Sequence, residues 1–501
     1  MKRTSDEVAS LTGWNADWAG LRVAVLGLGL TGFSVADTLA ELGAKVLVLA
    51  AGADDALADL LEVISVPLRR EGLQSELTGF DPELVVVSPG FAPSNPLVMR
   101  AAENGIPIWG DVELAWRLRD RSGRTAQWIA ITGTNGKTTT ARLTTAMLQA
   151  GGKQAVACGN IGVPVLDAIR DPSGFDVLVV ELSSFQLHYL HSMSAHASVC
   201  LNLSDDHLDW HGSASAYRAA KAAVYQNTRV ACVYNLEDDA TRELVEQADV
   251  VEGCLAVGFG LGLPGPGDVG LVGEVLVARA FLRDGWRSAA EITTVAELET
   301  VGLGAPHMVA NVLAASALAR SLDVSPADIR SSLLTFRLDP HRTEPVLSRG
   351  GVSWVNDSKA TNPHAAAAAL ESYDSVVWIV GGLLKGADLT EVMTAHLGRL
   401  RAVIVIGVDR STVTEMFTRH APQLPVFEVN AADTKEVMPE AVRLAAAAAT
   451  AGDTVLLAPA AASMDQFTDY ADRGNRFAEA VRHTMGVGTV GENSDTPATE
   501  L

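Results

Sequence analysis

The chain has 501 residues, enough for about three domains of ordinary size. Its formal net charge of −22 at pH 7, without a lysine- or arginine-rich cluster, argues against nucleic acid and anionic membranes as partners. The four cysteines form no CxxC pairs, no apolar run is long enough to span a membrane, and the N-terminus lacks an apolar signal region. We therefore expect a cytoplasmic protein without a disulfide framework or a zinc site.

The first part of the chain has the pattern of a dinucleotide-binding unit. The apolar run Leu21–Leu26 predicts a buried strand, which leads into a GxGxxG turn at Gly27–Gly32 and then a helix. The next predicted strand is Lys45–Leu49. An NAD site would place Asp or Glu after this strand to bind the ribose, and Ala50 stands there instead. We therefore expect a nucleotide or diphosphate ligand other than NAD.

A phosphate-binding loop opens the second part of the chain, between the strand-like run Trp128–Ile131 and a helical pattern that begins at Thr140. The loop residues are Gly133, Thr134, Asn135, Gly136, Lys137, Thr138 and Thr139. Such a turn points backbone N–H groups and a helix N-terminus at an anion. Lys137 can reach terminal phosphates, and the Thr138 hydroxyl can bind Mg²⁺. The glycine spacing differs from that of the common P-loop, but the context predicts binding of a nucleoside triphosphate.

Acidic and histidine side chains follow the next two predicted strands. Glu181 ends the strand Val177–Val180, and His207 lies in the acidic segment Asn202–Asp209 after the strand Ser198–Leu201. At the carboxyl ends of strands beside a phosphate loop, these groups favour a Mg²⁺ site. Taken singly, Glu181 could face solvent and His207 could be an ordinary loop histidine. Taken together with Thr138, they predict metal binding.

Lys221 lies on the same face as Tyr217 in the predicted helix Ala214–Gln226. A lysine on an otherwise apolar helix face usually extends past the edge of the core so that its charge reaches water. The pattern alone does not single this residue out for a chemical role.

The third part of the chain has polar turns after three predicted strands. These turns are Asn356–Pro363, Gly381–Gly386 and Ala458–Phe467, and a basic pair, His341–Arg342, stands at the start of this part. Open α/β sheets bind ligands at the carboxyl ends of their strands. The coincidence of three such turns predicts a substrate or nucleotide site.

Strands and helices alternate along the whole chain, which predicts an α/β fold with three doubly wound domains. The first and last should be Rossmann-like and the central one of the P-loop type. We expect domain boundaries at 1–124, 125–340 and 341–487, with hinges at the two junctions and a disordered tail at 488–501. Within the central domain, the glycine- and proline-rich stretch Gly258–Gly273 predicts a surface excursion with short strands.

Six short segments together resemble the Mur ligases of peptidoglycan synthesis, and the resemblance covers nearly the whole chain. The segments are VVELSSFQL (Val179–Leu187), DDHLD (Asp205–Asp209), YRAAK (Tyr217–Lys221), HRTEPV (His341–Val346), NDSKATNP (Asn356–Pro363) and SMDQF (Ser463–Phe467). The pattern is similar to that of the ligases that join D-glutamate to UDP-N-acetylmuramoyl-L-alanine. It implies a monomeric cell-wall enzyme with UDP-binding, ATPase and amino-acid-binding domains, ATP and two Mg²⁺ ions, and an acyl-phosphate intermediate.

The resemblance also implies a role for individual residues. ATP would be held by the phosphate loop together with Asn311, Arg342 and Asp357. The catalytic residues would be Lys137, His207 and a carbamylated Lys221. Mg²⁺ would be bound by Thr138, Glu181, His207 and Lys221. The UDP-substrate would contact Leu30, Thr31, Ser88 and Asn160. D-Glutamate would contact Thr361, Lys385, Ser463 and Tyr470.

Three positions depart from the family pattern. Ala50 stands where an acidic residue is frequent near the uridine end, Met308 follows His307 where Asn is common, and Tyr470 stands where Phe is frequent. Two rival functions remain at this level. A nucleotide-sensing protein without turnover would explain the two glycine-rich turns but not Glu181 and His207. A sister ligase that adds L-alanine or a diamino acid would differ only in its amino-acid substrate.

Overall fold

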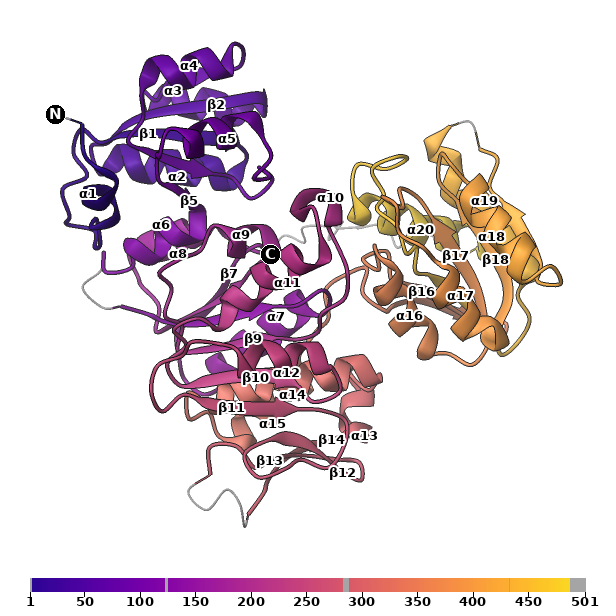
Figure 1. Cartoon of the computed structure of the whole chain (residues 1–501). Coiled ribbons are helices and arrows are strands. Elements are labelled where there is room, and N and C mark those ends of the chain that lie inside the picture. The colour runs from indigo at the N-terminus through magenta and orange to yellow at the C-terminus, as the bar shows by residue number, and fades with distance from the viewer. Residues whose placement is uncertain (1, 122–124, 283–287, 432, 487–501) are drawn as a thin grey trace, which may run out of the picture. The chain divides into compact units, whose positions relative to one another are not determined.

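The structure is a computed structural model, and it describes residues 2–121, 125–282, 288–431 and 433–486. These residues contain three mainly parallel sheets covered by helices, in agreement with the predicted α/β fold (Figure 1). Their contacts divide the chain into two compact units, one that ends at Phe336 and one that begins at Arg337. The first unit contains two of the sheets and the second unit contains the third.

The first sheet has the order β3-β2-β1-β4-β5. Its elements are α1 (Ser5–Ala9), β1 (Arg22–Leu28), α2 (Leu30–Glu41), β2 (Lys45–Ala53), α3 (Asp55–Val63), β3 (Leu68–Arg69), α4 (Leu73–Phe80), β4 (Leu84–Val87), α5 (Pro96–Glu103), β5 (Ile108–Gly110) and α6 (Asp111–Arg117). A Cβ atom on Gly32 would lie 2.2 Å from the Gly27 carbonyl oxygen, so α2 can approach β1 only with glycine there. Strand β2 extends past the predicted end at Leu49, because Ala50 is still buried in the core.

The second sheet has nine strands in the order β14-β13-β12-β11-β10-β9-β6-β8-β7. Its elements are β6 (Gln127–Thr132), α7 (Lys137–Ala150), β7 (Ala155–Gly159), α8 (Val165–Arg170), β8 (Val177–Glu181), α9 (Ser184–His188), β9 (Ala197–Cys200), α10 (Leu208–His211), α11 (Ala214–Ala222), η1 (Ala223–Tyr225), β10 (Ala231–Asn235), α12 (Asp239–Glu246), β11 (Leu255–Phe259), β12 (Val269–Val272), β13 (Val275–Ala278), β14 (Ala290–Thr294), α13 (Val295–Glu299), α14 (Pro306–Arg320) and α15 (Pro326–Thr335). Strands β12 to β14 are antiparallel, so the glycine-rich excursion extends the sheet instead of adding a crossover. Gly273, with φ +61°, permits the tight turn between β12 and β13.

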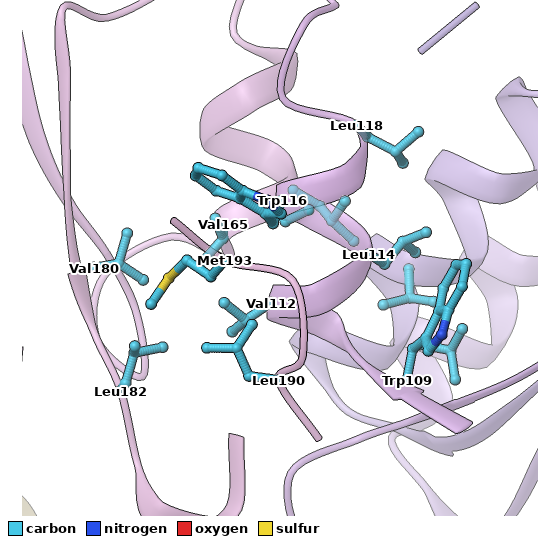
Figure 2. Packing of buried hydrophobic residues seen from close by; sticks show 14 of the residues in the cluster. Trp109, Val112, Leu114, Trp116, Leu118, Val165, Val180, Leu182, Leu190 and Met193 are labelled. Carbon is cyan, nitrogen blue, oxygen red and sulfur yellow. The ribbon is translucent and has the colours of Figure 1, made fainter. Parts of the chain in front are cut away.

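The two sheets of the first unit share one hydrophobic core. Figure 2 shows Val112 and Trp116 of α6 beside Val165, Leu190 and Met193, which follow later strands of the chain. Ion pairs add to this contact, because Arg170 of α8 lies 2.6 Å from an Asp37 carboxylate oxygen on α2. This continuous packing explains why the expected hinge near residues 121–124 does not separate two compact units; residues 122–124 themselves lie outside the described residues.

The third sheet has the order β15-β16-β20-β17-β18-β19. Its elements are β15 (Glu344–Arg349), β16 (Val352–Asn356), α16 (Pro363–Glu371), β17 (Val376–Gly381), α17 (Thr390–His396), η2 (Leu397–Arg399), β18 (Leu400–Ile406), α18 (Ser411–His420), β19 (Val426–Glu428), α19 (Thr434–Ala448), β20 (Thr454–Leu457) and α20 (Tyr470–Thr484). The edge strand β15 is antiparallel to β16, and the other pairings are parallel. Because β20 lies between β16 and β17, three polar turns emerge at neighbouring strand ends.

Every helix among the described residues is too short or too polar to cross a lipid bilayer. The four cysteines are free thiols. The tail predicted at 488–501 lies outside the described residues.

Candidate active site

The predicted phosphate loop joins β6 to α7. Gly133 and Gly136 have φ angles of +150° and +81°, which favour glycine, and Gly136 is the N-cap of α7. The loop therefore leads directly into a helix N-terminus, the kind of position at which anions bind. A Cβ atom on Gly136 would lie 2.5 Å from Asn311 Oδ1, so α14 packs directly against this turn.

A neighbouring segment holds the loop in shape. Asn202 accepts a hydrogen bond from the Asn135 N–H through its side-chain oxygen, and its backbone carbonyl accepts one from the Thr134 N–H (2.8 and 3.0 Å). The Thr134 hydroxyl lies 3.0 Å from the Tyr217 hydroxyl. Sequence reasoning missed these two positioning residues. Their signal was weak: a polar residue just after a strand, and a tyrosine one turn before Lys221.

Two lysine ammonium groups meet at the loop. Lys137 Nζ donates to the carbonyl oxygens of Gly133 and Thr134 (both 2.9 Å). Lys221 Nζ donates to Gly133 O (2.8 Å) and to Thr132 Oγ1 (2.9 Å). Lys221 is only 2% exposed, so it does not reach solvent as the pattern alone suggested. Burial, assisted by the charge of Lys137, lowers the pKa of Lys221 from 10.5 to about 7.

Glu181 is the last residue of β8 and is 1% exposed, which excludes the alternative of a solvent-facing carboxylate. One carboxylate oxygen accepts a hydrogen bond from Asn160 Nδ2 (2.9 Å). The other oxygen is buried and has no hydrogen-bond partner among the described residues. A buried carboxylate oxygen without a partner is costly, and a cation is a suitable partner for it.

His207 stands at the N-cap of α10 in a left-handed conformation, with φ +52°. Its side chain is 42% exposed, and its ring lies 4.7 Å from the Phe185 ring, centroid to centroid. Across the described ranges, no three His, Cys, Asp or Glu side chains are grouped to hold a metal ion. Thr138 and Glu181 are the oxygen-bearing side chains predicted for a divalent cation here, whereas a charged Lys221 ammonium would repel a cation.

The residues predicted for the UDP end lie around the GxGxxG turn and, for Asn160, directly after β7. Leu30, 70% exposed, and Thr31 form the first turn of α2, and Ser88 Oγ lies 3.5 Å from the Gly27 carbonyl. Asn160 is apart from these three, beside Glu181. Of the departures from the family pattern, Ala50 and Met308 are buried.

In the second unit, the segment that begins at His341 is bonded to the turn after β16. Asn356 Nδ2 lies 2.8 Å from His341 Nδ1, and the Thr343 N–H donates to an Asp357 oxygen (3.2 Å). Burial raises the pKa of Asp357 to about 6, although the neighbouring Arg342 charge and the Thr343 bond act against the rise. The structure therefore brings the predicted pair Arg342 and Asp357 together.

The turns after β17 and β20 are joined by a two-residue bridge. Leu383 and Ala462 exchange backbone hydrogen bonds of 2.9 and 3.1 Å. Lys385 and Ser463 follow these residues closely in sequence, so the bridge holds both turns at one edge of the sheet. Lys385 is exposed and lines a groove of about 1020 Å³, whereas Ser463 is buried and is not among its lining residues.

Arg473 of α20 joins the turn after β16 to the turn after β20, and sequence reasoning missed it. It is fully buried, and it donates to Ser358 Oγ (3.0 Å), to Ser358 O (2.8 Å) and to Ala461 O (3.1 Å). Burial lowers the pKa of Arg473 to about 10. The Ser358 hydroxyl in turn donates to the Tyr470 carbonyl (2.7 Å), whereas Thr361 lies three residues further along the same turn. Nothing in the pattern RGNRF distinguished this arginine from a surface one.

Three domain models of one family match consecutive parts of the chain. They are the MurD-like N-terminal domain of Mur ligases at residues 21–110, the Mur ligase middle domain at 131–319, and the Mur ligase glutamate ligase domain at 341–461. A relative from Leifsonia xyli subsp. xyli is 59% identical over 97% of both chains and is named UDP-N-acetylmuramoylalanine--D-glutamate ligase. A relative of the same name from Streptomyces avermitilis is 50% identical over 93% of this chain and 99% of its own.

Solved structures show the same fold at low identity. The chain is similar to the UDP-N-acetylmuramate-alanine ligase MurC from Thermotoga maritima, with a TM-score of 0.54, 20% identity and coverage of 93% of this chain and all of that one. It is also similar to a MurF ligase from Thermotoga maritima solved in complex with ADP, with a TM-score of 0.52, 16% identity and coverage of 82% of this chain and 92% of that one. On the extent of these matches, and above all on 59% identity over 97% of both chains, the chain belongs to the Mur ligase family.

Proposed function

We propose that this protein joins D-glutamate to UDP-N-acetylmuramoyl-L-alanine through an amide bond, with ATP as the energy source, in peptidoglycan precursor synthesis. The names of its relatives at 59% and 50% identity support this substrate pair. The observation that carries the proposal is the site after β6. There a glycine-rich turn at a helix N-terminus adjoins Lys137, Lys221 and a buried Glu181 oxygen that has no hydrogen-bond partner among the residues the structure describes.

The residues proposed to contact ATP come from both units. Its phosphates would bind the residues from Gly133 to Thr139, because the helix start supplies N–H donors and Lys137 supplies a positive charge. Asn311 would contact the nucleotide from α14, against which the loop packs. Arg342 and Asp357 would complete the nucleotide site from the second unit.

Two Mg²⁺ ions are proposed, held by Thr138, Glu181, His207 and Lys221. When bound, Mg²⁺ would neutralise phosphate charge and polarise the phosphoryl oxygens. The free Glu181 oxygen supports one such site. The Lys221 side chain supports it only after its positive charge is removed.

Carbamylation would remove that charge. The neutral Lys221 amine attacks CO₂, a C–N bond forms and one proton is released, which leaves a carboxylate. Because burial lowers the pKa of Lys221 to about 7, a much larger share of this amine is neutral at pH 7 than of an ordinary lysine. The product would also replace the repulsion between Lys221 and Lys137 with attraction.

The proposed reaction has two steps, and positively charged side chains would stabilise both. The alanyl carboxylate would attack the terminal phosphorus of ATP, which yields an acyl phosphate and ADP. The D-glutamate amine would then attack the acyl carbon, and the tetrahedral intermediate would expel phosphate. Negative charge accumulates in both steps, so Lys137 and Arg342 would stabilise the transition states electrostatically.

The two substrates would be bound by residues from different parts of the sequence. The UDP-substrate is assigned to Leu30, Thr31, Ser88 and Asn160. D-Glutamate is assigned to Thr361, Lys385, Ser463 and Tyr470. We assign the corresponding domains to 1–124, 125–340 and 341–487, and we propose that the enzyme is a cytoplasmic monomer.

The test is ADP and phosphate release with ATP, Mg²⁺, UDP-N-acetylmuramoyl-L-alanine and one amino acid at a time. D-Glutamate alone should support turnover, and L-alanine, L-glutamate and a diamino acid should not. Chelation of Mg²⁺ should abolish turnover, and Lys137→Ala should do the same while thermal unfolding stays near that of the wild type. Equal turnover with L-alanine or a diamino acid would assign the chain to a sister reaction.

A further inference from the structure

An aromatic cluster runs from the proposed metal loop to the other sheet of the first unit. Phe185 stacks on Trp210, with ring centroids 4.5 Å apart and an interplanar angle of 24°, and Phe185 also contacts the ring of His207. Tyr189, 5% exposed, packs edge-on against Trp210 at 6.2 Å. The cluster therefore connects α9 and α10 of the central sheet region with each other.

Both Tyr189 and Trp210 donate a hydrogen bond to the turn after β4. The Tyr189 hydroxyl donates to the Phe91 carbonyl (2.9 Å), and Trp210 Nε1 donates to the Gly90 carbonyl (3.3 Å). Both rings also belong to the hydrophobic cluster formed by β1, β2, β4 and α5. Two side chains from the central sheet region thus fix the backbone of residues 90–91.

The turn after β4 in turn limits the space of the GxGxxG turn. A Cβ atom on Gly27 would lie 2.8 Å from a ring carbon of Phe91 and 2.9 Å from Ser88 Oγ. A displacement of residues 88–91 would therefore also displace Gly27 and, through Gly27, the start of α2. Close packing of this kind transmits small shifts instead of absorbing them.

We infer that Tyr189 and Trp210 are positioning residues for the UDP end of the substrate, which they set in place through the turn at residues 88–91. This inference rests on the proposed function and extends it, because the same cluster contacts His207 of the proposed metal loop. If the cluster served only as core packing, loss of a single polar contact would reduce stability without altering the affinity for any one substrate.

The test uses substitutions that keep an aromatic ring and remove the donor, although Trp210→Phe also makes the ring smaller. Tyr189→Phe and Trp210→Phe each lose one hydrogen bond to the turn. Tyr225→Phe is the matched control, because the buried Tyr225 hydroxyl donates to the Val233 carbonyl (2.7 Å) and lies wholly within the central sheet. For each variant we would measure thermal unfolding, calorimetric affinity for UDP-N-acetylmuramoyl-L-alanine without ATP, and KM for all three substrates.

Tyr189→Phe and Trp210→Phe should each weaken UDP-substrate affinity and raise its KM about fivefold, the effect of one lost hydrogen bond. KM for ATP and D-glutamate should change less than about twofold on the same scale. Tyr225→Phe should lower thermal stability and leave all three KM values unchanged. Unchanged UDP-substrate affinity in both ring variants, or an equal rise in all three KM values, would overturn the inference. Failure of the proposed function would instead appear in the wild type, as absence of D-glutamate-dependent turnover.

Discussion

At the scale of single residues, the site depends on charges that are buried next to one another. Lys221 and Lys137 share the Gly133 carbonyl as an acceptor, and Glu181 has one oxygen without a partner among the described residues. Two ammonium groups this close repel each other, which is part of the reason that the pKa of Lys221 is low. Such an arrangement costs stability unless a ligand or a modification compensates for it.

Replacement of Lys221 tests the carbamate directly. Lys221→Ala should reduce kcat by at least about 1000-fold, because a group that holds Mg²⁺ in the transition state is lost. Acetate or propionate should restore part of the rate by supplying a carboxylate in the gap. Arg218→Ala is the control from the same helix, since its ion pair with Glu243 is exposed and should be dispensable. A Lys221→Ala enzyme with near-normal kcat and no added acid would disprove the carbamate role.

The buried carboxyl of Asp111 should make stability depend on pH. Burial raises its pKa from 3.8 to about 6, although the hydrogen bond from Gln186 opposes the shift. Because the pKa is higher in the folded state, this group's stabilising contribution is complete below about 3.8 and is lost as pH rises through 6. The Asn side chain of Asp111→Asn cannot ionise. The difference in free energy of unfolding between this variant and the wild type should therefore shift by about 1.5 kcal/mol in favour of the variant from pH 5 to pH 8. Denaturant unfolding of both proteins measures this gain, and parallel pH profiles would contradict it.

At the scale of elements, the functional groups collect at the carboxyl ends of parallel strands. Strands β6, β8 and β9 contribute the phosphate loop, Glu181 and the segment that pins the loop, and strands β16, β17 and β20 contribute the turns of the second unit. The bridge between Leu383 and Ala462, and the buried Arg473, fix those turns relative to one another. Parallel strands place these ends along one edge of the sheet, which is why distant segments meet there.

The turn after β17 should determine selectivity for the amino acid. Lys385 is exposed and lines the groove at this edge, and D-glutamate carries two carboxylates that need a fixed cation. Lys385→Ala should raise KM for D-glutamate about 10- to 100-fold, as expected for loss of a charge-assisted hydrogen bond, and change KM for ATP little. Lys435→Ala, at an exposed position of the same unit, should leave both constants unchanged. Similar increases in both KM values for the Lys385 variant would place this lysine elsewhere.

At the scale of the whole molecule, the proposed reacting groups belong to two units. The phosphate loop lies in the unit that ends at Phe336, and Arg342 and Lys385 lie in the unit that begins at Arg337. The proposed reaction uses groups of both units, so it predicts that substrate binding draws the units together and keeps water from the acyl phosphate.

Small-angle scattering can detect this closure in solution. Addition of a non-hydrolysable ATP analogue and UDP-N-acetylmuramoyl-L-alanine should reduce the radius of gyration. The largest change is expected with both ligands, since the proposed contacts span both units. The control is the protein with UDP as its only ligand, and its radius of gyration should differ little from that of the ligand-free protein. Superimposable profiles under all conditions would show that turnover does not need closure.

The sequence by itself determined the features that depend on local pattern. Glycines at 133 and 136 predicted a turn between a strand and a helix, and strand–helix alternation predicted the α/β fold, because turn conformation and hydrophobic period are set by neighbouring residues. Only the tertiary structure decided what depends on residues far apart in the chain. It buried Lys221 beside Lys137, left a Glu181 oxygen without a hydrogen-bond partner in the described part of the chain, and revealed Asn202, Tyr217 and Arg473 as supports. It also joined the first two predicted domains into one unit through the core around α6. Burial and pairing are properties of the assembled fold, so a single polar residue in the sequence carries no sign of them.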